Sequence, residues 1–194
     1  MLVGILADTH IPYRIPEIPT DVIEALRNVD VILHAGDVDD PWALSPLQQI
    51  APVYAVRGNY HVLDNSSGGK EFPRNQNLTL CGSNIVMTHG HMLGWSTLFW
   101  RMTGLLRAAL GAKNYHWRDA FTSRILIRKY PSADIYIFGH THRYYHKMYG
   151  QKLVLNPGAA CSAAYFNAQV ETSLIRLTLD IGAVPVVEKV VLAA

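Results

Sequence analysis

The chain has 194 residues, of which 49% are hydrophobic and 16% are charged, and its formal net charge is +2. This length and composition predict one domain with an ordinary core and exclude a disordered protein. Two cysteines far apart in sequence exclude a disulfide framework and a paired-thiolate zinc site. Asp8 interrupts the first apolar run early, and no later run approaches the ~18 residues of a membrane span. We therefore expect a cytoplasmic protein with no membrane partner.

The first third of the sequence alternates β-branched apolar runs with helical patterns. We expect strands at residues 2–7, 31–35 and 53–56, and helices at residues 20–28 and 42–50. Thr20 is the expected N-cap of the first helix, and Asp40-Pro41 precedes the second. Strands and helices in this β-α-β-α-β order predict a parallel sheet with right-handed crossovers.

The pattern then changes to a polar, glycine-rich stretch at residues 64–77, which we interpret as a loop. Strands at residues 78–81 and 84–88 flank Gly82-Ser83 and predict a hairpin. We expect helices at residues 95–110 and 115–130, the second of which Pro131 ends. Further strands are expected at residues 135–138, 144–149, 152–155, 173–179 and 184–192. The sequence thus predicts a layered α/β protein with a parallel and an antiparallel part.

Side chains that can bind metals follow five of the predicted strands, each just after the apolar run ends. They are Asp8 and His10, Asp37, Asn59, His89 and His91, and His140 and His142. Ligands of open α/β sheets bind at the carboxyl ends of the strands, which lie about 4.8 Å apart. We therefore expect these side chains to converge on one small volume. Glycine accompanies most of them, and we expect it to allow the sharp turns that aim them over the sheet.

The residue types predict the ligand. Neutral imidazole with carboxylate suits divalent transition metals, whereas calcium prefers oxygen ligands alone. The candidates outnumber the ligands of one ion, so we expect two ions that share a carboxylate. Two metals about 3.5–4 Å apart are the usual arrangement for hydrolysing phosphate esters. One bound water then loses its proton near neutral pH, and both ions neutralise charge on the phosphoryl oxygens.

The motifs in this order resemble a known family. Asp-x-His at residues 8–10, Gly-Asp at 36–37, Gly-Asn at 58–59, Thr-His-Gly-His at 88–91 and Gly-His-Thr-His at 139–142 are similar to those of the calcineurin-like metallophosphoesterase superfamily. Asn-Pro-Gly at 156–158 matches its small stand-alone phosphodiesterase branch in bacteria and archaea. The resemblance covers roughly residues 1–180. It implies an α/β fold in which two mixed β-sheets pack as a sandwich flanked by α-helices, and we expect one such domain over residues 1–194.

The resemblance also implies an activity and a ligand set. The protein would be a metal-dependent hydrolase, a phosphodiesterase, acting on a small phosphate-ester substrate with a hydroxide activated by a dinuclear centre. One ion would be held by Asp8, His10 and His142, and the other by Asn59, His89 and His140, with Asp37 as the bridge. We expect manganese, with iron, nickel, cobalt, zinc or magnesium as alternatives.

The general acid is left open by the sequence. Relatives with a histidine directly after the asparagine of Gly-Asn are thought to use it to protonate the leaving group. Here Tyr60 takes that position and His61 follows it, so His61 is a candidate that can point elsewhere, and Asp64 is another. A good leaving group needs no acid, so activated esters remain substrates in either case.

Two further residues are catalytic candidates, and three histidines are not. His91 can face the phosphate or orient His89, and Arg143 can pair with a carboxylate or reach the substrate. We expect the remaining histidines outside the motifs to be structural: His34, whose position also fits a contact behind the ligands, His116 and His146.

Residues 95–130 form an extended helical, aromatic and basic segment, with seven basic residues and one acidic residue. Three interpretations stay open: a cap over the site that selects the substrate, a contact between copies in a homo-oligomer, or an ordinary packed pair of helices.

Two other functions compete with the hydrolase. The first is a non-catalytic metal-binding scaffold or interaction subunit, because a eukaryotic trafficking-coat subunit resembles this fold with altered metal ligands. All seven ligand positions keep liganding residue types here, which favours the enzyme. The second is a nuclease, which the basic segment permits. Relatives that process DNA are larger and carry extra domains, so we do not expect nucleic acid as the partner.

Overall fold

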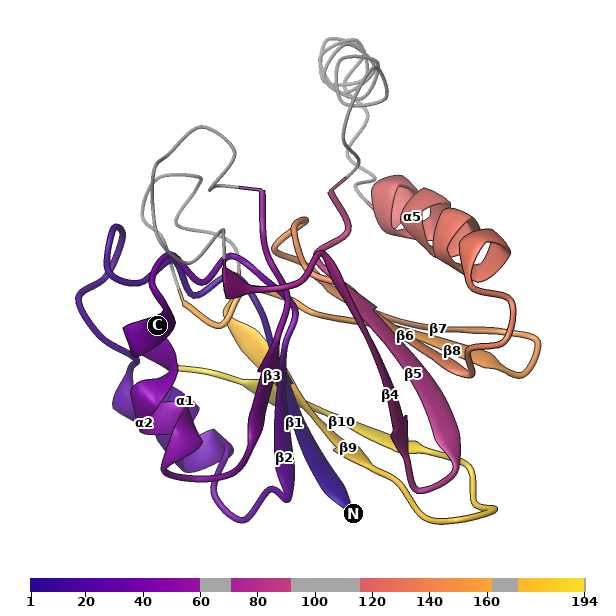
Figure 1. Cartoon of the computed structure of the whole chain (residues 1–194), viewed down its shortest axis with the longest axis horizontal. Coiled ribbons are helices and arrows are strands. Elements are labelled where there is room, and N and C mark those ends of the chain that lie inside the picture. Colours follow the sequence, from indigo (N-terminus) through magenta and orange to yellow (C-terminus); the bar gives the residue numbers. More distant parts are fainter. Residues whose placement is uncertain (60–70, 92–115, 162–170, 194) are drawn as a thin grey trace, which may run out of the picture.

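The computed structural model describes residues 1–59, 71–91, 116–161 and 171–193. Its strands form two five-stranded sheets (Figure 1). The first sheet has the order β10-β9-β1-β2-β3. Its strands are β1 (Leu2–Leu6), β2 (Val31–His34), β3 (Val53–Ala55), β9 (Ser173–Thr178) and β10 (Val186–Val191). As predicted, β1, β2 and β3 are parallel, whereas β9 runs antiparallel to both of its neighbours.

The second sheet has the order β4-β5-β6-β8-β7. Its strands are β4 (Asn75–Leu80), β5 (Ser83–Thr88), β6 (Ile135–Ile137), β7 (Tyr144–Tyr149) and β8 (Lys152–Pro157). The strands β5, β6 and β8 are parallel, and β4 and β7 pair antiparallel at the two edges. Both sheets are therefore mixed, as the family resemblance implied.

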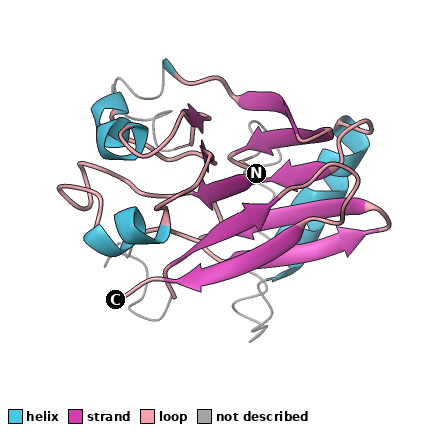
Figure 2. Ribbon diagram, turned by 90° about the horizontal axis from the view of Figure 1, so that it is seen from below, coloured by secondary structure: helices cyan, strands magenta, loops and turns pink. Residues whose placement is uncertain are grey.

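The described helices lie on the outer faces of the two sheets (Figure 2). They are α1 (Thr20–Ala25), the 3-10 helix η1 (Pro41–Leu44), α2 (Ser45–Gln48) and α5 (His116–Lys129). Side chains of the first sheet pack against α1, η1 and α2 in one cluster, and side chains of the second sheet pack against α5 in another. Within these ranges every helix is too short or too polar to cross a bilayer.

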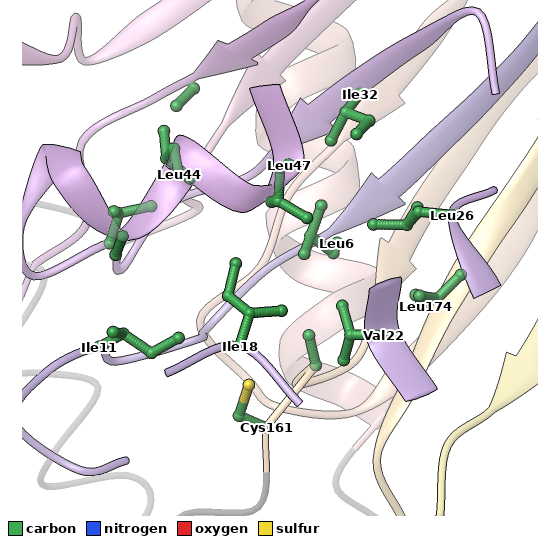
Figure 3. Close-up of a cluster of buried hydrophobic side chains, with 14 of the residues drawn as sticks. Leu6, Ile11, Ile18, Val22, Leu26, Ile32, Leu44, Leu47, Cys161 and Leu174 are labelled. Atoms are coloured by element: carbon green, nitrogen blue, oxygen red, sulfur yellow. The ribbon is translucent and has the colours of Figure 1, made fainter. Parts of the chain in front are cut away.

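A third cluster fills the space between the sheets. Val3, Ile5 and Leu33 of the first sheet meet Met87 and Ile137 of the second, and all five are fully buried. The opposite face of the first sheet is equally apolar: Figure 3 shows Leu6 and Ile32 among the side chains that contact the helices. Strands covered on both faces need an unbroken apolar run, which explains why β1 and β2 lack a polar alternation.

Two predicted helices are shorter than expected. The first begins at Thr20, but Pro19 is its N-cap and no side chain caps it, so the expected Thr20 cap is wrong. It ends at Ala25, before residue 28, because Asn28 adopts a left-handed φ of 62°. The predicted helix at residues 42–50 divides into η1 and α2, since Pro46 has no amide hydrogen to continue the ladder. Asp40 accepts a hydrogen bond from the Trp42 amide at its start.

The hairpin also differs from its prediction. The turn is Cys81-Gly82 rather than Gly82-Ser83, and both residues have positive φ, as a two-residue hairpin of this twist requires. The strand β4 begins at Asn75, so the predicted loop at residues 64–77 ends earlier. An edge strand with one solvated face tolerates polar residues. The first three residues of β4 are polar, so the sequence pattern did not indicate a strand there. The expected helix at residues 95–110 lies outside the described residues, and α5 matches the one at 115–130.

Candidate metal centre

The predicted ligands gather where the two sheets meet, at the carboxyl ends of their parallel strands. Asp8 and His10 follow β1, Asp37 follows β2 and Asn59 follows β3, all in the first sheet. The second sheet supplies the others from β5 and β6, namely His89, His91, His140 and His142. The predicted convergence is therefore present, but it joins the ends of two facing sheets rather than the edge of one.

One cluster combines two carboxylates and two imidazoles. The ligand atoms of Asp8, His10, Asp37 and His142 all lie within 4.8 Å of one another. His142 Nε2 lies 3.4 Å from Asp8 Oδ1, and His10 Nε2 lies 3.5 Å from Asp37 Oδ2. Asp8 Oδ1 is buried without a well-aligned hydrogen-bond donor among the described residues. A buried carboxylate oxygen in this position fits a cation, because an unpaired buried charge is costly.

A second cluster centres on the amide oxygen of Asn59. His89 Nε2 and His140 Nδ1 each lie 2.8 Å from Asn59 Oδ1. His89 Nδ1 donates to the Ala35 carbonyl at 2.9 Å, which orients the ring and leaves Nε2 to face the site. His89 Nε2 also lies 3.4 Å from Asp37 Oδ2. Two ring nitrogens and an amide oxygen are a donor set that divalent transition metals accept.

Asp37 lies between the two clusters. Its Oδ1 accepts a hydrogen bond from the Asn59 amide at 3.0 Å, and its Oδ2 faces both His10 and His89. One oxygen atom is therefore within 3.5 Å of a ring from each sheet. Each cluster contains the side chains that the family resemblance implies for one ion, and Asp37 faces both; that these side chains bind two ions stays a prediction.

The ligand residues themselves adopt the unusual backbone conformation. Five of them have a left-handed φ between 52° and 72°: Asp8, His10, Asp37, His140 and His142. Such a conformation costs roughly 1–2 kcal/mol per residue, and it clusters where function requires a fixed side-chain direction. The prediction that glycine makes the turns holds for Gly36, at φ 100°, but not for Gly58. Gly58 instead provides room, since a Cβ there would lie 1.7 Å from Asp37 Oδ1.

Hydrogen bonds behind the ligands hold the loops together. His34 Nδ1 accepts from the Gly36 amide, which leaves His34 Nε2 to donate to the Thr9 hydroxyl at 3.1 Å. That hydroxyl donates to the Asp37 carbonyl. Burial lowers the pKa of His34 to about 4, so the ring stays neutral and this donor pattern is fixed. His34 is therefore a structural histidine, and it contacts the loops that carry the predicted ligands, as its position in the sequence suggested.

The loop that carries His140 and His142 has its own support. Asn156 donates from Nδ2 to the Gly139 carbonyl and to the Thr141 hydroxyl, both at 3.0 Å. Thr141 in turn donates to Asp119 Oδ1 on α5 at 2.7 Å. Asn156 and Asp119 are both fully buried. These bonds link β8 and α5 to the residue between the two histidines, so that each ring points to its own cluster.

The buried carboxylates attract positive charge. Burial lowers the pKa of His89, but Asp37 outweighs it and raises this pKa to about 9. Burial likewise opposes protonation of His142, and Asp8 outweighs it, so the pKa of His142 is also raised. The pKa of His140 falls to about 3 and that of His91 to about 4, because both rings are buried and feel the charge of His89. The two buried carboxylates thus favour the protonated form of His89 and of His142.

Asp39 is a residue of the site that the sequence analysis missed. It is fully buried, and its Oδ1 lies 3.7 Å from His10 Nδ1 while His10 Nε2 faces Asp37. Neither oxygen of Asp39 has a hydrogen-bond partner in the described part of the chain. A carboxylate behind a ligating imidazole fixes the ring and makes it a stronger ligand. The available signal was its position, two residues after Asp37 at the same strand end.

The three catalytic candidates differ in their placement. The ring of His91 lies 5.5 Å from that of His89 and 6.5 Å from that of His140, beside the second cluster. Arg143 directly follows His142 and precedes β7, and its positive charge helps to lower the pKa of Asp119, which burial raises. His61, like Asp64, lies outside the described residues. The catalytic role of all three stays a prediction.

Comparison with known proteins identifies the relationships of the chain. Residues 1–180 match the family model described as the calcineurin-like phosphoesterase superfamily domain. A probable metallophosphoesterase of Methanothermobacter thermautotrophicus is 34% identical over 159 residues, which cover 82% of this chain and 77% of that protein. A probable metallophosphoesterase of Methanocaldococcus jannaschii is 31% identical over 159 residues, which cover 82% of this chain and 68% of that protein.

Solved structures share the fold at lower identity. Wild-type Vps29 of Entamoeba histolytica, in complex with zinc, is 22% identical with a TM-score of 0.66, and covers 98% of this chain and 99% of its own. A structure described as a novel archaeal phosphodiesterase is 20% identical with a TM-score of 0.64. The match covers 99% of this chain and 100% of that protein. At this identity both support the two-sheet fold alone.

The role of Asp39 predicts a change in metal affinity. Asp39→Asn keeps the shape of the side chain but removes the charge behind His10, so we expect Mn²⁺ to bind about tenfold or more weakly. Calorimetric titration of the metal-stripped protein measures this. Asp40→Asn is the matched control, because Asp40 caps η1 and an asparagine there still accepts from Trp42. Equal affinities of the two variants would contradict the assignment.

The raised pKa of His89 predicts a pH dependence of metal binding. At pH 7 the ring is protonated, since its pKa is about 9, and it must lose that proton before Nε2 binds a metal. Metal affinity should therefore rise with pH, by about tenfold per unit for one displaced proton, between pH 6.5 and 8.5. Titrations with Mn²⁺ in buffers of different ionisation enthalpy count the released protons. An affinity independent of pH would show that His89 is not a ligand.

Proposed function

This chain belongs to the calcineurin-like phosphoesterase superfamily, and we propose that it hydrolyses phosphodiesters, in preference to monoesters, with two bound divalent metal ions. The observation that carries the proposal is the Asp37 carboxylate, one oxygen of which faces a ligand cluster on each side. A shared carboxylate is what brings two ions close enough to act on one phosphate.

In this proposal Asp8, His10 and His142 hold one ion, Asn59, His89 and His140 hold the other, and Asp37 binds both. When bound, the ions activate a water molecule as the nucleophile and neutralise charge on the phosphoryl oxygens. The donor set supports manganese and also accepts iron, nickel, cobalt, zinc or magnesium. It does not resemble a calcium site, because four of the seven side chains are imidazoles.

The residues of the chain have the remaining tasks. Asp37 Oδ1 fixes the Asn59 backbone, Asp39 orients His10, and the Ala35 carbonyl keeps the proton of neutral His89 on Nδ1. His91, whose pKa lies near 4, is neutral at physiological pH and offers its ring to the substrate beside the second cluster. His61 and Asp64 remain the candidates for the general acid, on which esters with poor leaving groups would depend.

The preference for diesters rests on relatives. Residues 156–158 match the stand-alone phosphodiesterase branch, and a structure with the same fold is described as an archaeal phosphodiesterase. The proposed setting is the cytoplasm, with a small phosphate ester as the partner and a homo-oligomer as an open possibility. A scaffold of the same fold is the alternative, since Vps29 shares it. A nuclease is the second alternative function. It would bind DNA at low ionic strength and lose that binding as the salt concentration rises.

The proposal predicts that Asp37→Asn abolishes metal-dependent hydrolysis of an aryl phosphodiester. The variant keeps the oxygen that accepts from the Asn59 amide but removes the charge shared by the two clusters. Release of nitrophenolate from bis(4-nitrophenyl) phosphate, with Mn²⁺ added to stripped protein, measures the rate. We expect a loss of at least about a hundredfold, the size seen when one group that stabilises the transition state electrostatically is removed.

Asp180→Asn is the matched control for this experiment. Asp180 lies beyond the end of β9, 3.7 Å from the amino group of Met1, and so at the opposite end of the first sheet. Circular dichroism should show both variants folded. Full activity of Asp37→Asn would contradict the shared-carboxylate site. No Mn²⁺-dependent activity in the parent protein on monoesters, diesters and cyclic nucleotides would favour the scaffold instead.

A further inference from the structure

A cavity of about 350 Å³ opens between α5 and the ends of β4 and β5. Its volume lies within the range of small-molecule sites. Its wall includes Arg74, Lys129, His91, Tyr130, Ile125 and Leu126. None of the assigned ligand residues lines it, so this cavity is distinct from the two ligand clusters.

His91 lies between the cavity and the candidate metal centre. The ring of His91 lines the cavity, while its centroid lies 5.5 Å from that of His89 and 6.5 Å from that of His140. His91 Nδ1 is buried without a hydrogen-bond partner in the described part of the chain. A polar atom that is buried and unpaired at the boundary of two spaces fits a ligand that extends across it.

The charge in the cavity has one sign. Arg74 and Lys129 line it together, and no aspartate or glutamate of the described residues does. Within the described ranges neither cation forms an ion pair with a carboxylate, although other surface cations such as Arg27 and Arg176 do. Two unneutralised cations in a concave site attract an anion.

The helix α5 supplies an apolar wall. Ile125 and Leu126 of α5 line the cavity together with Tyr130, which directly follows this helix. Lys129 Nζ lies 5.1 Å from the centre of the Tyr130 ring. An apolar and aromatic wall with a few polar groups is the usual composition of a site for an organic ligand. The cavity thus offers contacts for a ring and for a negative charge at once.

We propose that this cavity binds the part of the substrate beyond the scissile phosphate, and that this part is a ring-containing group with a second negative charge, such as a carboxylate or a further phosphate. Arg74 and Lys129 hold the second charge, and α5 contacts the ring. The inference rests on the proposed function, because it places the scissile phosphate at the metal ions. It assigns the substrate class as an organic phosphodiester with an additional anionic group.

The test uses non-hydrolysable ligands in matched pairs. Each ligand is a benzene ring with a phosphonate, attached directly or through one or two methylene groups, and each is paired with the analogue that carries an added carboxylate on the ring. Calorimetry with Mn²⁺-loaded protein gives the dissociation constant of all six. We expect the carboxylate to tighten binding about fivefold to tenfold for at least one spacer, as two exposed ion pairs allow.

Variants identify the source of this gain. Arg74→Gln with Lys129→Gln should abolish the preference for the carboxylate, measured as the ratio of the two dissociation constants within each pair of ligands. Arg124→Gln with Arg128→Gln is the control, because it removes two exposed positive charges from α5 at positions that do not line the cavity. The control should retain the preference. The inference is overturned if no carboxylate binds more tightly in the parent protein, or if the preference survives in the first variant.

Binding needs no turnover, so the two proposals fail separately. A protein that hydrolyses diesters without any carboxylate preference retains the proposed function and overturns the cavity assignment. A protein without hydrolytic activity that still selects the carboxylated phosphonates through Arg74 and Lys129 supports the cavity as an anion site and contradicts the activity.

Discussion

The Asp37 carboxylate connects the two halves of the fold. It follows β2 of the first sheet, and its Oδ2 lies 3.5 Å from His10 of that sheet and 3.4 Å from His89 of the other. The distance between these two rings is set by the side chains that fill the space between the sheets, with Val56 and Met87 buried near the carboxyl ends of β3 and β5. Protein interiors are packed as densely as crystals, so the core holds the ligands of the two clusters at a fixed separation.

The same site concentrates conformational strain. Five ligand residues in the left-handed region and a glycine packed against Asp37 Oδ1 would be unfavourable in an ordinary loop. They persist because the neighbouring groups restrict them: the Asp8 amide donates to the Gly36 carbonyl, and the His10 amide donates to the Asp37 carbonyl. These contacts fix the direction in which the ligand side chains point. Asp37 and Asp8 also raise the pKa of His89 and of His142, so the carboxylates attract protons to the rings that would bind a metal.

Much of this could be predicted because residue type and strand position carry the information. Apolar runs such as β1 indicate buried parallel strands, and each metal-binding side chain follows one of them. Other features depend on partners that the sequence does not specify. The polar first residues of β4 pair with β5 because β4 is an edge strand. Nothing in the sequence distinguishes Asp39 from other acidic residues, because its role depends on the nearby ring of His10. The cavity forms only because α5 packs close to the end of β5, and the hydrogen bond from Thr141 to Asp119 also depends on where α5 lies. The sequence does not specify that position.

Two ions bridged by one carboxylate are the central claim, and anomalous diffraction from crystals grown with Mn²⁺ tests it directly. The account predicts two anomalous peaks about 3.5–4 Å apart. Asp8, His10 and His142 would then hold one ion, Asn59, His89 and His140 would hold the other, and Asp37 would contact both. A single ion at full occupancy in saturating Mn²⁺, or two ions that do not share Asp37, would contradict it.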